Sequence, residues 1–258
     1  MAVPLTNRDV DWDRWPVTEY LDELYREIQP EDDAVLVHHS TFYRQFAPGE
    51  FGRSVELGAG PNLYPLMLAA AVSRDIEAVE PSAASVAYLS RQLTDGADES
   101  WVSYYRRCRE LQPALPATLA AALARVRVRR GGVQDLQRGG YDLASMHFVA
   151  ESATEDAAEF HAMCGSFVHS VRPGGYLIAA FMENMGNYRI ADGPVWPGYP
   201  VDAGIVRAVF APLTTHLQVS RVDADPTGPG YECTGLVLLT ARRAPVLPGH
   251  GHAAQAAD

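Results

Sequence analysis

A pair of glycines and a downstream acid are the residues whose types and spacing point most directly to chemistry. Gly58-Ala59-Gly60 follows a short apolar run, and Glu80 ends a second β-rich run 22 residues after Gly58. A glycine turn at the carboxyl end of a parallel strand lets a ligand approach the backbone closely. An acid at the end of the next strand can accept hydrogen bonds from both hydroxyls of a ribose. The spacing predicts a nucleotide site for NAD, FAD or S-adenosylmethionine (SAM), and an ordinary β-to-α turn is the alternative.

The residues after the second glycine favour SAM among these three ligands. Pro61-Asn62-Leu63-Tyr64 follows Gly60, so the third glycine of a dinucleotide fingerprint is missing. In that fingerprint the pyrophosphate lies at the N-terminus of the helix. SAM has no phosphate, and the polar side chains of Asn62 and Tyr64 suit its carboxylate and ribose. We therefore predict SAM as the cofactor and S-adenosylhomocysteine (SAH) as its product.

Methyl transfer to an amine needs an acceptor that has lost a proton, because an ammonium group has no lone pair. A carboxylate in a dry pocket can attract the cation and pass its proton to water. Glu183, after a predicted strand, and Glu151 and Asp202 are the candidates. The alternative interpretations are solvated loop acids at Glu183 and Asp202 and a helix cap at Glu151.

One histidine and a group of aromatic residues complete the candidate site. His147 ends a predicted strand beside the expected sulfonium, where it can act as a base if the acceptor is a hydroxyl. A place in the pocket wall is the alternative. Tyr188, Trp196 and Tyr199 lie in an irregular stretch and can form an aromatic cage for a cation. A hydrophobic plug under a long loop is the other interpretation.

Other residues that often carry chemistry are predicted to be structural. His38 and His39 are neighbours on a predicted helix, so their side chains point about 100° apart and make a poor metal pair. Cys108, Cys164 and Cys233 lie far apart without a CxxC motif, which is typical of reduced thiols in a cytosolic protein. We expect no metal site.

The composition indicates one α/β enzyme domain. The chain of 258 residues is long enough to bury a large core, and its net charge is −11. A nucleic-acid partner would need a basic stripe, so none is expected. The chain shows no basic-then-apolar leader and no apolar run approaching about 18 residues. We therefore expect a cytoplasmic protein, without a membrane partner, that is a monomer or a homodimer.

Hydrophobic patterning predicts alternating strands and helices along most of the chain. The predicted strands cover residues 54–57, 76–80, 126–130, 141–148, 176–181, 217–222 and 233–241. The predicted helices begin near residue 15 and cover residues 33–46, 62–73, 82–93, 153–171 and 201–213, with an insertion at 94–125. Five βα-type units followed by a hairpin predict a seven-stranded sheet with one antiparallel strand.

Three parts follow from this pattern. Residues 1–50 are predicted to form a loose arm and a helical lid, and residues 51–243 the catalytic domain. Residues 244–258 are rich in Pro, Gly, His and Ala and are predicted to be a disordered tail. Tyr20 and Tyr25 fall on the apolar face of the first helix. That face either packs on the domain or forms a lid lined by phenols.

Three motifs agree with one family. Glu56-Leu57-Gly58-Ala59-Gly60-Pro61-Asn62-Leu63-Tyr64 is similar to a pattern Asp-Ile-Gly-Ser-Gly-Pro-Thr-x-Tyr, and Tyr20-Leu21 with Tyr25 to a pattern in an N-terminal helix. Pro173-Gly174-Gly175 matches a turn before the fifth strand. Through these motifs residues 15–243 resemble the small-molecule N-methyltransferases of nicotinamide, phenylethanolamine and indolethylamine (thioether). The resemblance implies a class I SAM-methyltransferase fold, which is a Rossmann-like seven-stranded mixed sheet with an antiparallel terminal hairpin and an N-terminal helical lid.

The resemblance also implies roles for single residues. It implies cofactor contacts for Tyr20, Tyr25, Gly58, Gly60, Asn62, Tyr64, Glu80 and Val133, and we add Ala59, Pro81, Ser82, Gln134 and His147 as cofactor-binding candidates. The substrate-binding candidates are Tyr20, Glu183, Tyr188, Trp196 and Asp202, and the catalytic candidates are Glu183, His147 and Glu151. The chain departs from the family pattern in three places. Glu80 replaces an Asp, Gly132 stands where an Asp binds adenine, and Phe181 stands where an acid binds the substrate.

The predicted function is SAM-dependent methyl transfer to a small molecule, with an amine nitrogen favoured as the acceptor. The first alternative is an O-methyltransferase of a natural-product hydroxyl, with His147 as the base. The second is a SAM-binding protein without catalysis, which the missing acid at Phe181 motivates. NAD-dependent oxidoreduction is disfavoured because the third glycine is absent.

Overall fold

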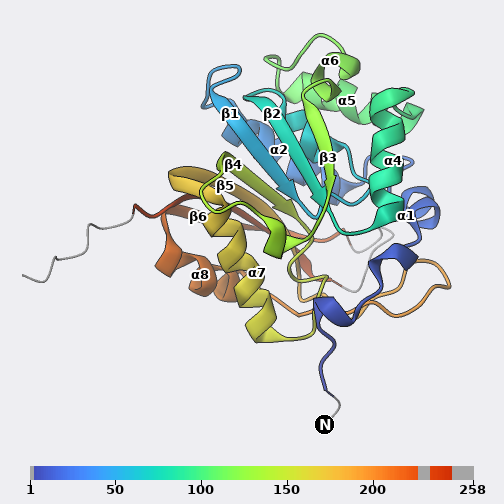
Figure 1. Cartoon of the computed structure of the whole chain (residues 1–258), viewed down its shortest axis with the longest axis vertical. Coiled ribbons are helices and arrows are strands. Elements are labelled where there is room, and N and C mark those ends of the chain that lie inside the picture. Colours follow the sequence, from blue (N-terminus) through green and yellow to red (C-terminus); the bar gives the residue numbers. More distant parts are fainter. Residues whose placement is uncertain (1–2, 226–232, 246–258) are drawn as a thin grey trace, which may run out of the picture.

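A seven-stranded sheet runs through the centre of the molecule (Figure 1). This computed structural model describes residues 3–225 and 233–245. The strand order is β3-β2-β1-β4-β5-β7-β6. The bounds are β1 (Phe51–Leu57), β2 (Ser73–Glu80), β3 (Val126–Arg130), β4 (Tyr141–His147), β5 (Val171–Glu183), β6 (Thr214–Asp223) and β7 (Gly235–Arg243). Strands β1 to β5 pair in parallel, and β7 is antiparallel to both β5 and β6, which confirms the predicted mixed sheet and terminal hairpin.

Helices cover both faces of the sheet. Their bounds are α1 (Val17–Leu24), α2 (Pro30–Tyr43), α3 (Tyr64–Ala69), α4 (Ala83–Thr94), α5 (Glu99–Leu111), α6 (Leu119–Leu123), α7 (Ala157–Ser170) and α8 (Ala203–Phe210). Apolar side chains of α2 to α6 form one core against the sheet, and those of α7 and α8 form a second core against its other face. Figure 1 shows α7 and α8 together on one side of the sheet and α2 on the other. No helix in the described part of the chain is long and apolar enough to cross a membrane.

Short polar side chains set where several helices begin. The Oγ of Ser82 accepts a hydrogen bond from the backbone N–H of Ser85 at the start of α4. Asp156 caps α7 in the same way, and Asp202 caps α8. Such caps satisfy N–H groups that have no partner within the helix. The cap at Asp156 explains why α7 begins at Ala157 and not at residue 153 as predicted.

The turn predicted before the fifth strand is part of that strand. Strand β5 begins at Val171, so Pro173-Gly174-Gly175 lies within its first half. The register of β4 and β5 shifts between Tyr141 and Leu143, which marks an irregularity at this point. The φ of Gly174 is +76°, a conformation that glycine adopts without strain. The strand therefore continues through a bulge that local patterning marks as a turn.

The N-terminal arm is docked on the domain, which corrects the prediction of a loose arm. Leu5 donates its N–H to the Oε2 of Glu155, and its carbonyl accepts the N–H of Glu155. Asp13 accepts hydrogen bonds from Arg130 and from the N–H of Ala83. Most of the predicted tail, residues 246–258, lies outside the described residues.

Candidate functional site

The turn between β1 and α3 depends on its glycines. Gly58 and Gly60 have φ of +63° and +55°, in the left-handed region that other residues rarely adopt. A Cβ at Gly58 would also lie 2.6 Å from a methyl carbon of Val149. The N–H of Gly58 donates to the carbonyl of Val79, which ties the turn to β2. The backbone of this turn is therefore exposed to any ligand beyond the strand ends.

Glu80 joins the ends of the first two βα units. Its Oε2 accepts the N–H of Gly60 at 2.9 Å, and its Oε1 accepts the N–H of Ser82 at 2.8 Å. The residue is buried, and burial raises the pKa of its carboxyl to about 7. Each oxygen of a carboxylate can accept more than one hydrogen bond. Glu80 is therefore held rigidly with acceptor capacity left for a ligand.

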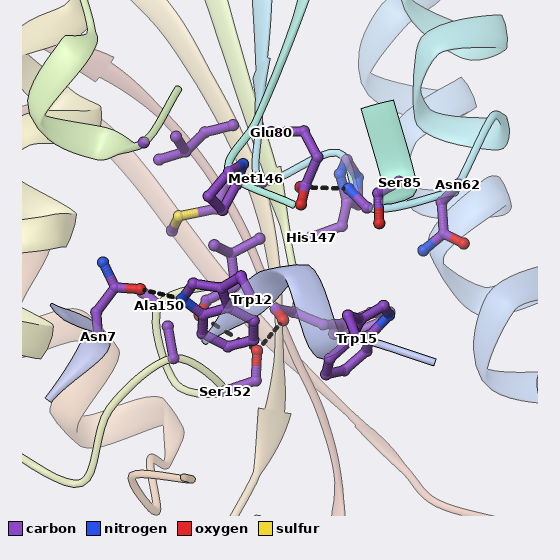
Figure 2. Close-up of a pocket in the computed structure, with 18 of the residues that line it drawn as sticks. Asn7, Trp12, Trp15, Asn62, Glu80, Ser85, Met146, His147, Ala150 and Ser152 are labelled. Atoms are coloured by element: carbon purple, nitrogen blue, oxygen red, sulfur yellow. Dashed lines mark hydrogen bonds between the residues drawn. The ribbon is translucent and has the colours of Figure 1, made fainter. Parts of the chain in front are cut away.

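A cavity opens beyond the carboxyl ends of β1, β2 and β4, where ligands of open α/β sheets bind. Its empty volume, including the open mouth, is about 960 Å³. Figure 2 shows Glu80, Met146 and His147 from the strand ends on one side and Trp12 and Trp15 from the arm on the other. Further wall residues are Asn7, Tyr20, Gly58, Gly60, Pro61, Asn62, Pro81, Ser85, Gly132, Val133, Phe148, Val149, Ser152, Met163, Met182 and Tyr188.

Aromatic side chains from two distant segments close one side of this cavity. Trp12 stacks on Trp196 with ring centroids 5.5 Å apart, and the rings of Trp15 and Trp196 are 4.9 Å apart. Trp15 also contacts Tyr20 and Tyr188 through ring edges. In Figure 1 the blue arm and the orange loop after β5 lie side by side at the lower edge of the molecule. We call these five residues the aromatic cap.

Two tyrosine hydroxyls and an amide form a polar corner beside the cap. The hydroxyls of Tyr20 and Tyr25 are 3.1 Å apart, and the Nδ2 of Asn62 donates to both. Burial raises the pKa of Tyr20 to about 12, so its hydroxyl stays protonated near neutral pH. The Oδ1 of Asn62 is buried and has no partner among the described residues. An orphaned buried acceptor of this kind suits a donor group of a ligand.

His147 is part of the wall, but its ring nitrogens are already in use. Its Nδ1 lies 2.6 Å from Oε1 of Glu56, and its Nε2 lies 2.7 Å from Nε2 of His39. The hydroxyl of Ser145 donates to the second oxygen of Glu56. In this arrangement neither nitrogen of His147 is free to accept a proton from a molecule in the cavity.

The fold has counterparts among solved structures, although no protein-family model and no curated protein matches the sequence. A complex of DhpI with SAM and HEP is 15% identical, covers 90% of this chain and 94% of its own, and has a TM-score of 0.55. The N-methyltransferase NodS from Bradyrhizobium japonicum in complex with SAH is 11% identical, covers 91% and 93%, and has a TM-score of 0.52. A SAM-dependent methyltransferase from Methanosarcina mazei is 9% identical, covers 85% and 100%, and has a TM-score of 0.53. The chain has the fold of the class I SAM-dependent methyltransferases.

Two acids predicted to act on the substrate lie outside the cavity of this methyltransferase fold. Both oxygens of Glu183 accept hydrogen bonds from Nε of Arg221, and Oε2 also accepts the hydroxyl of Thr234. Asp202 is exposed and caps α8 by accepting the N–H of Ile205 at 2.7 Å. These contacts link strands and begin a helix, which corrects the predicted substrate roles of Glu183 and Asp202.

Glu151 lies closer to the cavity than Glu183 and Asp202 do, but it does not line the cavity. The residue is fully buried between the wall residues Ala150 and Ser152. Its Oε1 accepts the N–H of Met182 at 2.8 Å, and its Oε2 has no partner among the described residues. Burial raises the pKa of this carboxyl to about 8, so the neutral acid predominates at pH 7. The predicted helix cap at Glu151 is wrong, because Asp156 caps α7.

The remaining predicted residues divide into wall and support. Pro81 and Val133 line the cavity, whereas Ala59 and Tyr64 are buried outside it. Ser82 caps α4, and Gln134 is exposed. Tyr199 packs against Phe160, Trp196 supports the two arm tryptophans from behind, and Tyr25 supports Tyr20. In the described ranges no group of three or more His, Cys, Asp or Glu residues could hold a metal ion.

Sequence reasoning missed four contributors to the site. Trp12 and Trp15 were assigned to a loose arm or a helix start, although two tryptophans in a polar arm are a signal that such a segment has an apolar surface to cover. Glu56 belongs to the glycine motif and was not assigned a role. His39 is predicted to be structural, and nothing in its local sequence indicates a contact with His147.

Proposed function

We propose that this protein is an enzyme that transfers the methyl group of SAM to a small-molecule acceptor, most favourably an amine nitrogen. The observation that carries the proposal is Glu80, a buried acid tied to the glycine turn at the edge of a cavity beyond the strand ends. Its remaining acceptor sites fit the hydroxyls of a ribose. The complexes of DhpI with SAM and of NodS with SAH support SAM as the ligand of this fold.

The cavity offers a partner to each part of SAM. Val133 and Pro81 provide an apolar surface for an adenine ring beside Glu80. The free Oδ1 of Asn62 suits the ammonium group, and the hydroxyl of Tyr20, which lines the cavity, can donate to the carboxylate. When bound, SAM supplies a sulfonium methyl that reacts by in-line displacement. The chain's own contribution is to hold the acceptor close to that methyl and to exclude water.

The acceptor side favours neutral or positively charged molecules over anions. No arginine is among the wall residues, and the chain has no lysine. An acidic acceptor would therefore find no basic side chain in the wall to pair with, and burying a charge without such a partner costs free energy. The faces of Trp12, Trp15 and Tyr188 attract cations, which favours an amine.

Methyl transfer to a hydroxyl, methyl transfer to an amine and binding without catalysis place different demands on the residues of the cavity wall. Transfer to a hydroxyl needs a free base, and both nitrogens of His147 are bonded. This geometry favours an amine, because an amine can lose its proton to water and needs no free side-chain base. Binding without catalysis would leave the aromatic cap without an acceptor to enclose.

Isothermal titration calorimetry with SAM and SAH tests the proposal, and product mass spectrometry on matched amine, phenol and carboxylic-acid panels tests the acceptor. We expect binding of both nucleosides and methylation of amines only. Failure to bind SAM at millimolar concentration would refute the proposal. Methylation of phenols in preference to amines would favour the O-methyltransferase alternative, and tight binding without any product would favour the non-catalytic one.

A further inference from the structure

A line of hydrogen-bonded side chains passes through the wall residue His147 and reaches helix α2. It starts at Glu56 on β1, passes through His147 on β4 to His39 on α2, and ends at His38. The last contact joins the two Nδ1 atoms of His39 and His38, which lie 3.3 Å apart. Glu56, His147 and His39 are buried, and His38 is half-buried. We call these four residues the histidine chain.

The histidine chain is surrounded by few other ionisable groups. Within the described residues, the only ion-pair partner of Glu56 is His147. The groups that face the chain from the elements packed against it are the hydroxyl of Ser145 on β4, Asp32 and Tyr43 on α2, and Tyr64 on α3. The hydroxyl of Tyr43 faces Glu56 and Ser145, and the hydroxyl of Tyr64 faces Asp32. Burial raises the pKa of Asp32 to about 7, so the charge of this buried region is set by the protons on the histidine chain and on Asp32.

Hydrogen bonding allows the chain two proton arrangements. In one, each histidine is neutral and donates one N–H toward Glu56, so that every nitrogen between His38 and the carboxylate is paired. In the other, His39 donates toward His38 and accepts from Nε2 of His147, while Nδ1 of His147 still donates to Glu56, so both nitrogens of His147 carry protons. Burial lowers the pKa of His39 well below its ordinary value, so His39 stays neutral and its tautomer follows its neighbours. The two arrangements differ by one proton, and the chain's net charge is −1 in the first and zero in the second.

We infer that the histidine chain releases one proton to solvent when a positively charged molecule occupies the cavity and takes one up when that charge is lost. This inference rests on the proposed function. A sulfonium in the cavity favours the arrangement of charge −1, because a nearby negative charge stabilises a cation. Once the C–S bond breaks and its electron pair stays on sulfur, that positive charge is gone. The new C–N bond forms, the acceptor's proton goes to water, and the chain takes up one proton through the outer end at His38. Glu56 and His39 are thus positioning residues that act through His147.

Proton counting by calorimetry tests this inference on the full-length protein. SAM and SAH are titrated in two buffers of different ionisation enthalpy, between about pH 5 and 8, where histidines change charge. We expect SAM binding to release more protons than SAH binding, by a substantial fraction of one proton. SAM and SAH differ by one methyl group and the positive charge on sulfur, so the difference in proton count reports the loss of that methyl and its charge. Equal proton counts with normal SAM binding would overturn the inference and leave the proposed function intact, whereas absence of SAM binding would overturn both.

Variants identify which groups exchange the proton. Glu56→Gln preserves shape and hydrogen bonding but removes the counter-ion of a charged His147, so the difference in proton count should fall to near zero. His39→Phe removes the acceptor for the outward arrangement, should have the same effect, and decides the matter if Glu56→Gln does not fold. Glu77→Gln is the matched control, because it removes a carboxylate of the neighbouring strand β2 that pairs with Arg129 and Tyr141, and it should retain the wild-type difference. A difference that persists in folded Glu56→Gln would assign the proton to another acid, such as Glu80, and would overturn the inference.

Discussion

Glu80 is the residue on which the proposed cofactor site depends most. Replacing it with Gln leaves one backbone N–H without its acceptor and weakens the hydrogen bonds to a ribose. A hydrogen bond to a charged group contributes about 1.5–3 kcal/mol, so we expect SAM affinity to fall by roughly 10- to 100-fold. Isothermal titration measures this directly.

The matched control for Glu80 lies on the same strand. Glu77→Gln removes a carboxylate of β2 that pairs with Arg129 and Tyr141 and lines no part of the cavity. It should leave SAM affinity unchanged. Equal SAM affinities of wild type and Glu80→Gln would show that the ribose does not bind at Glu80.

At the scale of elements, α8 shows how a candidate functional acid can be a structural one. Asp202 caps the helix, and loss of such a cap costs about 1 kcal/mol of stability. Asp202→Ala should therefore lower the free energy of unfolding by that amount without a change in SAM affinity or turnover. Denaturant titration and enzyme assay check both. Asp202→Ser should keep the stability of wild type, because serine also caps helices. A loss of turnover in folded Asp202→Ala would show that Asp202 acts on the substrate.

The N-terminal arm is the element that completes the cavity. Trp12 is held by its stacking on Trp196 and by a 2.8 Å hydrogen bond from its Nε1 to Asn7. Trp12→Ala removes this part of the aromatic cap, so we expect KM for an amine acceptor to rise about tenfold, in line with the roughly 0.5–1.5 kcal/mol of an aromatic pair plus its lost buried area. Steady-state kinetics measure the change.

Val3→Ala serves as the control for the arm. Val3 belongs to the same segment and is 88% exposed, so its truncation should leave KM unaltered. An unchanged KM for Trp12→Ala would mean that the arm packs on the domain without contacting the acceptor.

For the molecule as a whole, buried acids set the pH dependence of stability. Burial raises the pKa of Glu151 from 4.5 to about 8, and it raises those of Asp32 and Glu80 to about 7. An acid whose pKa is raised by folding favours the folded state when it is neutral. Its contribution is fully present below the unfolded pKa and is lost as the pH rises through the folded one. Stability should therefore decline between about pH 4.5 and 8.

Glu151→Gln tests this origin of the decline. The amide keeps the shape and stays neutral at every pH, so the variant should lose less stability than wild type between pH 5 and 8. Thermal unfolding followed by circular dichroism across this range gives the comparison. Glu110→Gln, on an exposed part of α5, should decline like wild type. A parallel decline of Glu151→Gln and wild type would assign the effect to other groups.

Much of the fold was predictable because its signals are local. The alternation of residues 126–130 predicted β3 with its correct bounds, since side-chain direction in a strand depends only on neighbouring residues. Gly58 and Gly60 marked the turn because its backbone needs φ above zero. Strands β1, β4 and β5 are buried along most of their length, which requires helices on both sides of the sheet.

The sequence by itself determined the sheet, the glycine turn and the position of Glu80, because each follows from periodicity or backbone conformation within a few residues. Only the tertiary structure decided which distant side chains meet. Packing of α2 brings His39 against His147, 108 positions away, and the hairpin brings Arg221 and Thr234 to Glu183. Docking of the arm on the loop after β5 turns Trp12 from an apparent linker residue into part of the cavity wall. Such contacts depend on how whole elements pack against each other, and no local pattern carries that information.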